Sequence, residues 1–553
     1  MHYKISFSNA HRHFITIEYT VDVTGLDSVL LQLSSWRPGR YELGNFAKNI
    51  RTFRVLDQNN TVLKFDKYSK DSWNIECEDS SVITVSYEYY SNELNAGSTY
   101  LDEKQLYVNP INCCPYIVGM ENKSGTLEID VPADYDIAIA LKEQSQNIYA
   151  ISSYDELVES PFIASPDLTK WDYKVGDYQF YIWFQGKVFG DKDKIVQHFK
   201  TFSEYQIQKF GSLPVQEYHF LFHLTPFKSY HGVEHTASTV ITLGPDKEVF
   251  EEKLYEEFLG VSSHELYHAW NIKAIRPTEM KPYDYTAENY SKLGYIYEGL
   301  TTYMGDLCLW ESGVYTDKQF EHSFEVWLEK HFYNEGRNNM SVAHSSYDTW
   351  LDGYSMGIPG RKVSIYQDGA LCMFMIDSFI REYSDNKHSL HEVMKELYNN
   401  SNIIDNGYSE EQIHKIFIKY GGDRVKEVFE NHIYGTVDYS QNLHEAFRLR
   451  GWHWITKNNQ NSLESKLGIQ LINRNGEASI YRVIENGIAD QNNIAVGDVL
   501  LYLNKENIDL SSTDKFENIE NFNLTVKKKF YEQEILINQK QDLYFPKFKV
   551  QIN

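Results

Sequence analysis

The chain has 553 residues, of which 42% are hydrophobic, and a formal net charge of −25. This length predicts several domains with large cores, and the excess of acidic residues argues against nucleic acid and anionic membrane surfaces as partners. The five cysteines lack C-x-x-C spacing, so we expect free thiols, with neither a disulfide framework nor a cysteine-ligated zinc.

The sequence carries no sign of membrane insertion. None of its apolar stretches is long enough for a membrane-spanning helix, and its first residues lack the charged-then-apolar pattern of a secretory signal. We therefore expect a cytoplasmic protein, although a trimmed form of an exported protein would have the same sequence. The oligomeric state is left open.

The first part of the chain has the period-two pattern of β-strands. Apolar and polar residues alternate over residues 15–23, and the alternation returns at 83–89 and 127–131. We predict a β-rich domain over residues 1–175.

The pattern then changes to helical spacing. Most helix-like segments lie before residue 455, which predicts a mostly helical domain over residues 176–455. A predicted strand, 218–224, comes before Gly232-Val233-Glu234-His235, so Glu234 is expected on or beside a sheet edge, where an extended peptide can pair. Residues 334–361 are rich in Asn, Ser, Gly and Asp. They are predicted to form a long loop, either a lid over a cleft or a disordered surface segment.

The most informative motif is His264-Glu265-Leu266-Tyr267-His268, which matches H-E-x-x-H within a helix-like segment. Residues four apart share one face of a helix, so both imidazoles can bind one zinc ion while Glu265 lies beside the open coordination position. Zinc lowers the pKa of water, and a nearby carboxylate can remove the proton as the water attacks a carbonyl. We therefore predict Glu265 as the general base and one Zn²⁺ per chain.

A third ligand is expected on a following helix. Residues 295–304 predict an apolar, buried helix, in which an acidic residue is costly unless a cation neutralises it. We predict Glu298 as this ligand, the alternative being a salt-bridged or surface residue. The third His of H-E-x-x-H-x-x-G-x-x-H is missing, because residues 269–274 read Ala-Trp-Asn-Ile-Lys-Ala.

Several runs carry a resemblance to a known family. They are residues 264–273, 276–277 and 298–301, the Gly232–His235 element (G-x-E-H), Tyr366–Ala370 (similar to Y-x-K-G-A), and Trp36–Tyr41 (similar to W-x-P-G-x-Y). In these runs the chain resembles the glycyl aminopeptidase family of zinc metallopeptidases, in the thermolysin-like clan with Glu as third ligand. The resemblance implies a thermolysin-like catalytic domain, and peptides with a free N-terminus as substrates.

The resemblance also implies roles in substrate binding. Glu234, with Gly232 and His235, would bind the free α-ammonium group of a peptide, and Tyr366 would donate a hydrogen bond to the oxyanion. The plain alternatives are a solvated Glu and a packing Tyr. Asp368 stands where the family has Lys, which reverses a charge near Tyr366. The Trp36–Tyr41 turn is interpreted as scaffold.

The last hundred residues predict a separate module. Three apolar segments and the run Val496-Gly497-Asp498-Val499-Leu500 are similar to a PDZ domain, which we place at residues 460–553. In PDZ domains, backbone N–H groups of the loop that corresponds to Leu467-Gly468-Ile469 bind a peptide C-terminal carboxylate. A module that only packs is the alternative.

Together these elements predict a multi-domain α+β protein with three candidate functions. The first is a zinc aminopeptidase that releases small N-terminal residues, with Gly and Ala preferred. The second is a zinc endopeptidase with the same ligands. The third is a peptide-binding PDZ scaffold with little catalysis, against which the general base Glu265 argues, because a structural zinc site needs none.

Overall fold

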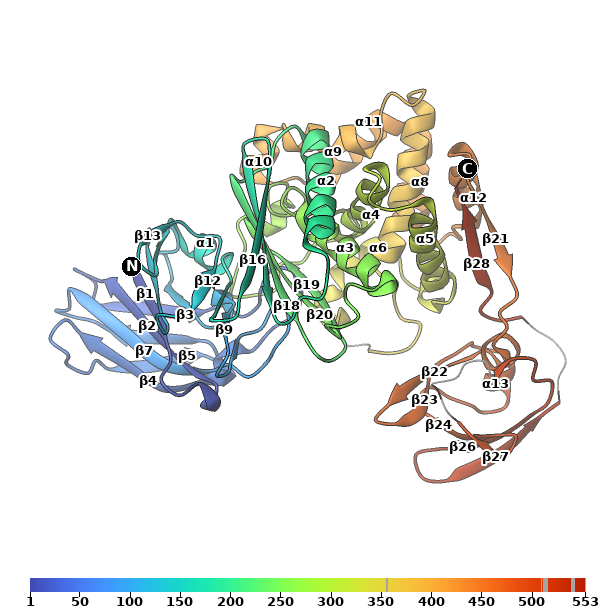
Figure 1. Cartoon of the computed structure of the whole chain (residues 1–553), viewed down its shortest axis with the longest axis horizontal. Coiled ribbons are helices and arrows are strands. Elements are labelled where there is room, and N and C mark those ends of the chain that lie inside the picture. Colours follow the sequence, from blue (N-terminus) through green and yellow to red (C-terminus); the bar gives the residue numbers. More distant parts are fainter. Residues whose placement is uncertain (355–356, 509, 511–515, 539–542, 553) are drawn as a thin grey trace. The chain divides into compact units, whose positions relative to one another are not determined.

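The computed structural model describes residues 1–354, 357–508, 510, 516–538 and 543–552. They fall into two compact units. The first contains Met1–Thr316, Tyr347–Tyr354 and Leu390–Ile416, and the second contains the other described residues. Figure 1 shows the strands of the N-terminal part in blue and teal and the helices of the middle part in green and yellow.

The first unit begins with three β-sheets, which confirms the predicted β-rich region. The predicted strands at 15–23, 83–89 and 127–131 are neighbours or near neighbours in a seven-stranded sheet of order β13-β14-β11-β1-β2-β7-β4. Its strands are β13 Glu143–Ser145, β14 Ile148–Ile151, β11 Gly125–Asp130, β1 His2–Ser6, β2 Phe14–Asp22, β7 Val82–Tyr90 and β4 Ile50–Asp57. In β2, buried residues alternate with partly exposed ones, as the period-two pattern predicts.

Two four-stranded sheets complete the N-terminal region. One has the order β10-β3-β6-β5, with β10 Pro115–Ile117, β3 Ser28–Leu33, β6 Ser72–Glu76 and β5 Phe65–Ser69. The other has the order β12-β15-β9-β8, with β12 Asp136–Ala138, β15 Phe162–Ser165, β9 Leu106–Val108 and β8 Tyr100–Leu101. The short helix α1, Tyr154–Val158, precedes β15.

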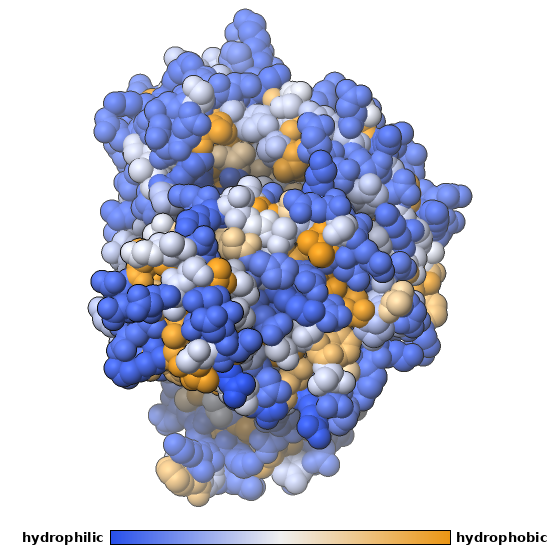
Figure 2. Space-filling view, turned by 90° about the vertical axis from the view of Figure 1, so that its left-hand side faces the viewer, coloured by the Kyte–Doolittle hydropathy of each residue, from blue (hydrophilic) through white to orange (hydrophobic). Residues whose placement is uncertain are grey.

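Figure 2 shows one face of the molecule, which is largely hydrophilic with scattered hydrophobic side chains.

A five-stranded mixed sheet follows. Its order is β16-β17-β18-β20-β19, with β16 Thr169–Val175, β17 Tyr178–Gln185, β18 Glu217–Leu224, β20 Ser238–Gly244 and β19 Ser229–Glu234. Strands β17, β18 and β20 are parallel, and β19 runs antiparallel at the edge. The sheet therefore has Glu234 at the end of an edge strand, as the sequence predicts.

Helices of the first unit pack on this sheet. Helix α2, Lys192–Phe210, begins at Asp191, whose side chain accepts from the Lys194 N–H, and ends at Gly211 in the left-handed region (φ 98°). Its Phe199 contacts Phe220 of β18 edge to face. Helix α3, Glu252–Tyr267, contacts strands β19 and β20, and the first unit also contains the π-helical segment η5 Tyr295–Leu300 and the helices α4 Thr301–Glu311, α9 Leu390–Tyr398 and α10 Ser401–Asn406.

The second unit contains helices and a C-terminal β-rich region. The helices are α5 Asp317–Phe332, α8 Gln367–Tyr383 and α12 Ser440–Leu449, while α11 Glu410–Val428 belongs to both units. Strand β21, His453–Lys457, pairs with β28, Lys547–Gln551. The last sheet contains β22 Ile469–Arg474, β23 Glu477–Val483, β24 Val499–Leu503, β25 Glu506–Asn507, β26 Phe522–Lys527 and β27 Glu532–Ile537, and α13 is Ile488–Gln491.

This C-terminal sheet encloses its own apolar cluster, which includes Leu467, Ile469 and Ile480. The β-rich character of the region is as expected. Its identity as a PDZ domain stays a prediction, and part of residues 460–553 lies outside the described residues.

The predicted long loop at 334–361 is wrong in part. The segment contains the 3₁₀ turn η6 Glu335–Asn338 and the helices α6 Val342–Tyr347 and α7 Thr349–Asp352. Its polar residues serve local turns: the Asn334 side chain accepts from the Gly336 N–H. Short polar side chains favour such capping positions, so a polar composition alone does not exclude helices.

Within the described residues, no helix combines the length and apolar character that crossing a bilayer requires.

Candidate metal centre and active site

Two helical segments of the first unit bring the predicted ligands together. His264 lies in the last turn of α3 and His268 directly follows it, with the two Nε2 atoms 3.0 Å apart. Glu298 comes from η5, and its Oε2 lies 3.6 Å from His264 Nε2 and 3.4 Å from His268 Nε2. Zinc binds imidazole nitrogens and carboxylate oxygens at about 2.0–2.2 Å, so three donors this close together suit one ion.

The packing of the two segments fixes this geometry. Gly305 of α4 lies against the backbone of His264, where an added Cβ would be 3.1 Å from the His264 Cα. His268 Nδ1 is 2.8 Å from the carbonyl oxygen of Asn271. The Asn271 side chain in turn donates to the Ile296 carbonyl at 2.8 Å. A metal-binding imidazole oriented by a backbone carbonyl is a common arrangement, and here it also ties the end of α3 to η5.

The predicted ligands change one another's pKa. Burial opposes ionisation of Glu298, but the neighbouring His268 and His264 lower its pKa to about 2. Burial also opposes protonation of His268, yet Glu298 raises the pKa of this imidazole to about 9. Glu298 is therefore a carboxylate at neutral pH, the form that ligates a cation.

Glu265 lies in the same buried group. Its exposed fraction is 5%, and burial first, then the charges of Glu234 and Glu298, raise its pKa to about 8. An added Cβ on Gly232 would overlap Glu265 Oε1, so a glycine is needed there for the carboxylate to take this position. A carboxyl group held beside the two imidazoles is in a position to exchange a proton with a water molecule there.

Glu234 completes the group. Its exposed fraction is 4%, and it forms a second cluster of donors with Glu265 and His268, whose ligand atoms lie within 4.8 Å of one another. Within the described residues, Glu234 Oε1 is buried without a hydrogen-bond partner. A buried carboxylate oxygen in this state is costly unless a cationic or hydrogen-bonding group meets it.

The third predicted substrate-binding residue lies beside a different pair. His235 Nδ1 is 3.8 Å from Glu159 Oε2. Glu159 accepts from Lys273 Nζ at 2.9 Å, and the two side chains are 3% and 1% exposed. Lys273 follows Ile272, whose φ of 103° is rare for a β-branched residue. The strained turn at Ile272 follows helix α3 and positions Lys273 for its ion pair with Glu159 of the N-terminal region.

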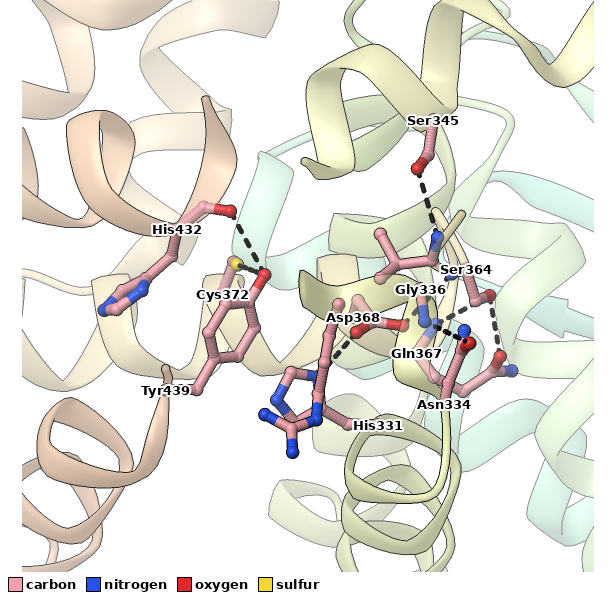
Figure 3. A network of polar contacts seen from close by, with 12 residues as sticks. His331, Asn334, Gly336, Ser345, Ser364, Gln367, Asp368, Cys372, His432 and Tyr439 are labelled. Atoms are coloured by element: carbon pink, nitrogen blue, oxygen red, sulfur yellow. Dashed lines mark hydrogen bonds and ion pairs between the residues drawn. The ribbon is translucent and has the colours of Figure 1, made fainter. Parts of the chain in front are cut away.

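Tyr366 lies in the second unit, at the residue before α8. Its N–H donates to Ser364 Oγ at 3.2 Å. Asp368 accepts from the Ser364 N–H at 3.1 Å and contacts His331 Nδ1 at 2.6 Å, so both of its oxygens are engaged inside the fold (Figure 3). Asp368 thus fixes the turn that carries Tyr366. The oxyanion role of Tyr366 stays a prediction.

The predicted peptide-binding loop of the C-terminal region overlaps the end of the π-helical segment η8, Leu463–Leu467. The Gly468 N–H donates to the Glu464 carbonyl at 3.0 Å, and the Leu467 and Ile469 side chains are buried in the local core. One of the predicted carboxylate donors is therefore engaged within the fold. Peptide binding by this loop stays a prediction.

Sequence reasoning missed the part of the N-terminal region that borders the site. The Trp36–Tyr41 turn, interpreted as scaffold, lies against Glu234: an added Cβ on Gly39 would be 2.5 Å from Glu234 Oε2. Tyr354, from the segment predicted as a loop, accepts from the Tyr41 N–H at 3.2 Å. The W-x-P-G-x-Y pattern was the available signal for the turn, whereas nothing in the sequence singles out Tyr354.

Comparisons with known proteins identify the family of the chain. The Peptidase M61 N-terminal domain matches residues 2–166, and the M61 glycyl aminopeptidase model matches residues 257–372, which together span just over half of the chain. No match was found among curated proteins.

Two solved structures share the fold. An aminopeptidase N family protein from Idiomarina loihiensis is 22% identical, with a TM-score of 0.91 over 100% of this chain and 98% of that one. An M1 zinc metallopeptidase from Deinococcus radiodurans is 12% identical, with a TM-score of 0.50 over 79% of this chain and 94% of that one. Fold and site define a metallopeptidase. The chain belongs to the M61 glycyl aminopeptidase family.

Proposed function

We propose that this metallopeptidase is a zinc aminopeptidase that releases small N-terminal residues, Gly and Ala above others, from peptides. The observation that carries the proposal is the buried carboxylate of Glu234, whose Oε1 has no hydrogen-bond partner within the described residues and lies beside Glu265 and His268. A substrate ammonium group would satisfy it with a charge-assisted hydrogen bond. The preference for Gly and Ala rests on the family resemblance.

His264, His268 and Glu298 would hold the ion. Zinc bound there would polarise the scissile carbonyl and make water acidic enough to lose a proton near neutral pH. Glu265 then accepts the proton of the attacking water and delivers it to the leaving amine. Glu234 holds the α-ammonium group, which places the first peptide bond at the ion and leaves no room for further residues before it. Tyr366 is the proposed donor to the oxyanion.

The test compares a free amine with a blocked one. Glycyl anilide and N-acetylglycyl anilide are assayed with the enzyme as prepared, after treatment with a chelator, and after zinc is restored. We expect hydrolysis of the free-amine substrate only, its loss with the chelator and its recovery with zinc. Comparable hydrolysis of the acetylated substrate would identify an endopeptidase, and activity that survives complete metal removal would refute the metal assignment.

A matched pair of variants tests Glu234 itself. Glu234→Gln keeps the shape of the side chain but removes its charge, so kcat/KM for glycyl anilide should fall by about 10- to 100-fold, the worth of one hydrogen bond to a charged group. Glu217→Gln makes the same change at an exposed position of the same sheet and should have no effect. An equal loss in both variants would contradict the assignment.

A further inference from the structure

A polar cavity of about 360 Å³ lies in the N-terminal region of the first unit, next to the turn that contacts Glu234. Arg37 lines it together with residues of the segments 40–49 and 93–99 and with Asn112. The segment 93–99 includes Gly97, where an added Cβ would overlap the Arg37 guanidinium. The glycine therefore lets the guanidinium lie flat against the backbone at the wall of the cavity.

Arg37 is a buried cation without an anionic partner. Its exposed fraction is 4%, and within the described residues no carboxylate lies within 4.0 Å of it. Its Nη1 donates a long hydrogen bond, 3.4 Å, to the Pro38 carbonyl. Burial lowers the pKa of Arg37 for the same reason. Burying a charge costs much free energy unless it is paired, so this guanidinium is suited to an external anion.

The other charged groups of the lining strengthen this reading. Arg40 pairs with Glu42, which neutralises both. Glu93 keeps its negative charge and accepts from the Asn95 amide at 2.7 Å, so the three cations and two carboxylates of the lining leave a net charge of +1. Exposed Lys48 adds a positive charge at the rim, where no ion pair with it is found among the described residues. In a chain with a net charge of −25, this local positive charge is a departure from the rest of the molecule.

We infer that this cavity binds the carboxylate group of a small ligand, with Arg37 as its main partner and Lys48 at its rim. A carboxylate fits because guanidinium offers two parallel N–H donors to its two oxygens. Two sources have this chemistry: a free organic acid, and the acidic side chain of an N-terminal residue whose amine is held by Glu234. The second source rests on the role of Glu234 in the proposed function and adds acidic residues to the small ones named there, whereas the first source does not depend on that function.

The geometry connects the cavity to the site. Gly39, between Arg37 and Arg40, contacts Glu234, and the charge of Glu234 raises the pKa of Arg37 in opposition to burial. Arg37 and Arg40 also add to the effect of burial that lowers the pKa of His231 on β19 to about 3. The same turn therefore lines the cavity through Arg37 and Arg40 and meets Glu234 through Gly39.

The first experiment measures binding and needs no turnover. Glutarate is titrated into the zinc-loaded enzyme by calorimetry at low ionic strength, with neutral glutaramide as the control ligand. We expect glutarate alone to bind. Arg37→Met should weaken binding at least 20-fold, Lys48→Met by a few-fold, and Arg51→Met, which removes a surface cation paired with Glu88, not at all. Equal binding to the Arg37→Met protein would place glutarate on the metal and overturn the inference, as would no binding to the unaltered enzyme.

The second experiment separates the two sources. Glutamyl and glutaminyl anilides differ only in the charge of the side chain, so their kcat/KM ratio isolates the carboxylate. A ratio above 10 that falls to about 1 in the Arg37→Met protein assigns the cavity to an acidic N-terminal residue. A ratio near 1 in both proteins, together with Arg37-dependent glutarate binding, assigns it to a free acid. Because the exposed Lys48 variant does not disturb the core, its few-fold effect remains informative if Arg37→Met does not fold.

Discussion

Gly39, in a turn of the N-terminal region, touches the carboxylate of Glu234, and a Cβ added to Gly39 would lie 2.5 Å from Glu234 Oε2. We predict that Gly39→Ala displaces this carboxylate and lowers kcat/KM for free-amine substrates by at least 10-fold, the loss of one charge-assisted contact. The control is Gly25→Ala, because Gly25 has nearly the same φ (81° against 79°) but open space around it. Similar activity loss in both variants would attribute the effect to backbone strain.

Glu265 should be needed for turnover and not for metal binding. In Glu265→Gln the three ligands are unchanged, so zinc content measured by atomic emission should stay at one ion per chain. Loss of the proton acceptor should lower kcat by 100-fold or more, the usual contribution of a general base. Near-normal kcat would exclude this residue as the base.

The buried pair of Lys273 and Glu159 predicts a large stability effect. Lys273→Met leaves Glu159 as an unpaired buried charge, which should lower the free energy of unfolding by about 3–5 kcal/mol. Urea unfolding followed by tryptophan fluorescence measures this, with the exposed Lys174→Met as control. The double variant Glu159→Leu, Lys273→Met should recover much of the loss. A single variant as stable as the control would show that the pair contributes little.

Asp368 offers a test within the second unit. Asp368→Asn keeps the size of the side chain but weakens the 2.6 Å contact with His331, for an expected loss of about 1.5–3 kcal/mol. If Tyr366 has its predicted role, kcat should fall while KM stays nearly constant, because the turn that carries Tyr366 loosens. Asp423→Asn, at an exposed position of α11, is the control. Unchanged stability and kcat in Asp368→Asn would show that this network does not position Tyr366.

The metal group could be predicted because its signals are local. Two histidines four apart on one helix must share a face, and Glu298 in an apolar segment needs a positive partner. The structure brings these three residues together. Glu234 could be placed at a sheet edge because a strand pattern precedes it, although its unpartnered oxygen depends on packing that no local pattern contains.

The contributions of Gly39 and Arg37 could not be predicted in the same way. Gly39 meets Glu234 across almost 200 residues of chain, and a turn motif does not indicate which surface it will contact. The loop predicted at 334–361 failed for a different reason: its helices are very short, and their polar residues cap backbone groups. The strands of the C-terminal module can be predicted from the sequence, but a strand pattern does not predict which ligand a module binds.

Hydrogen bonds hold the same N-terminal turn against residues 284 and 285, far along the chain. The Trp36 indole donates to the Asp284 carbonyl at 2.7 Å, and the Ser35 N–H donates to the Tyr285 carbonyl at 2.8 Å. A shortened gene that starts after residue 175 would therefore encode a protein that lacks the turn in contact with Glu234. Efforts to engineer a minimal enzyme from this scaffold should keep the leading sheets and trim elsewhere.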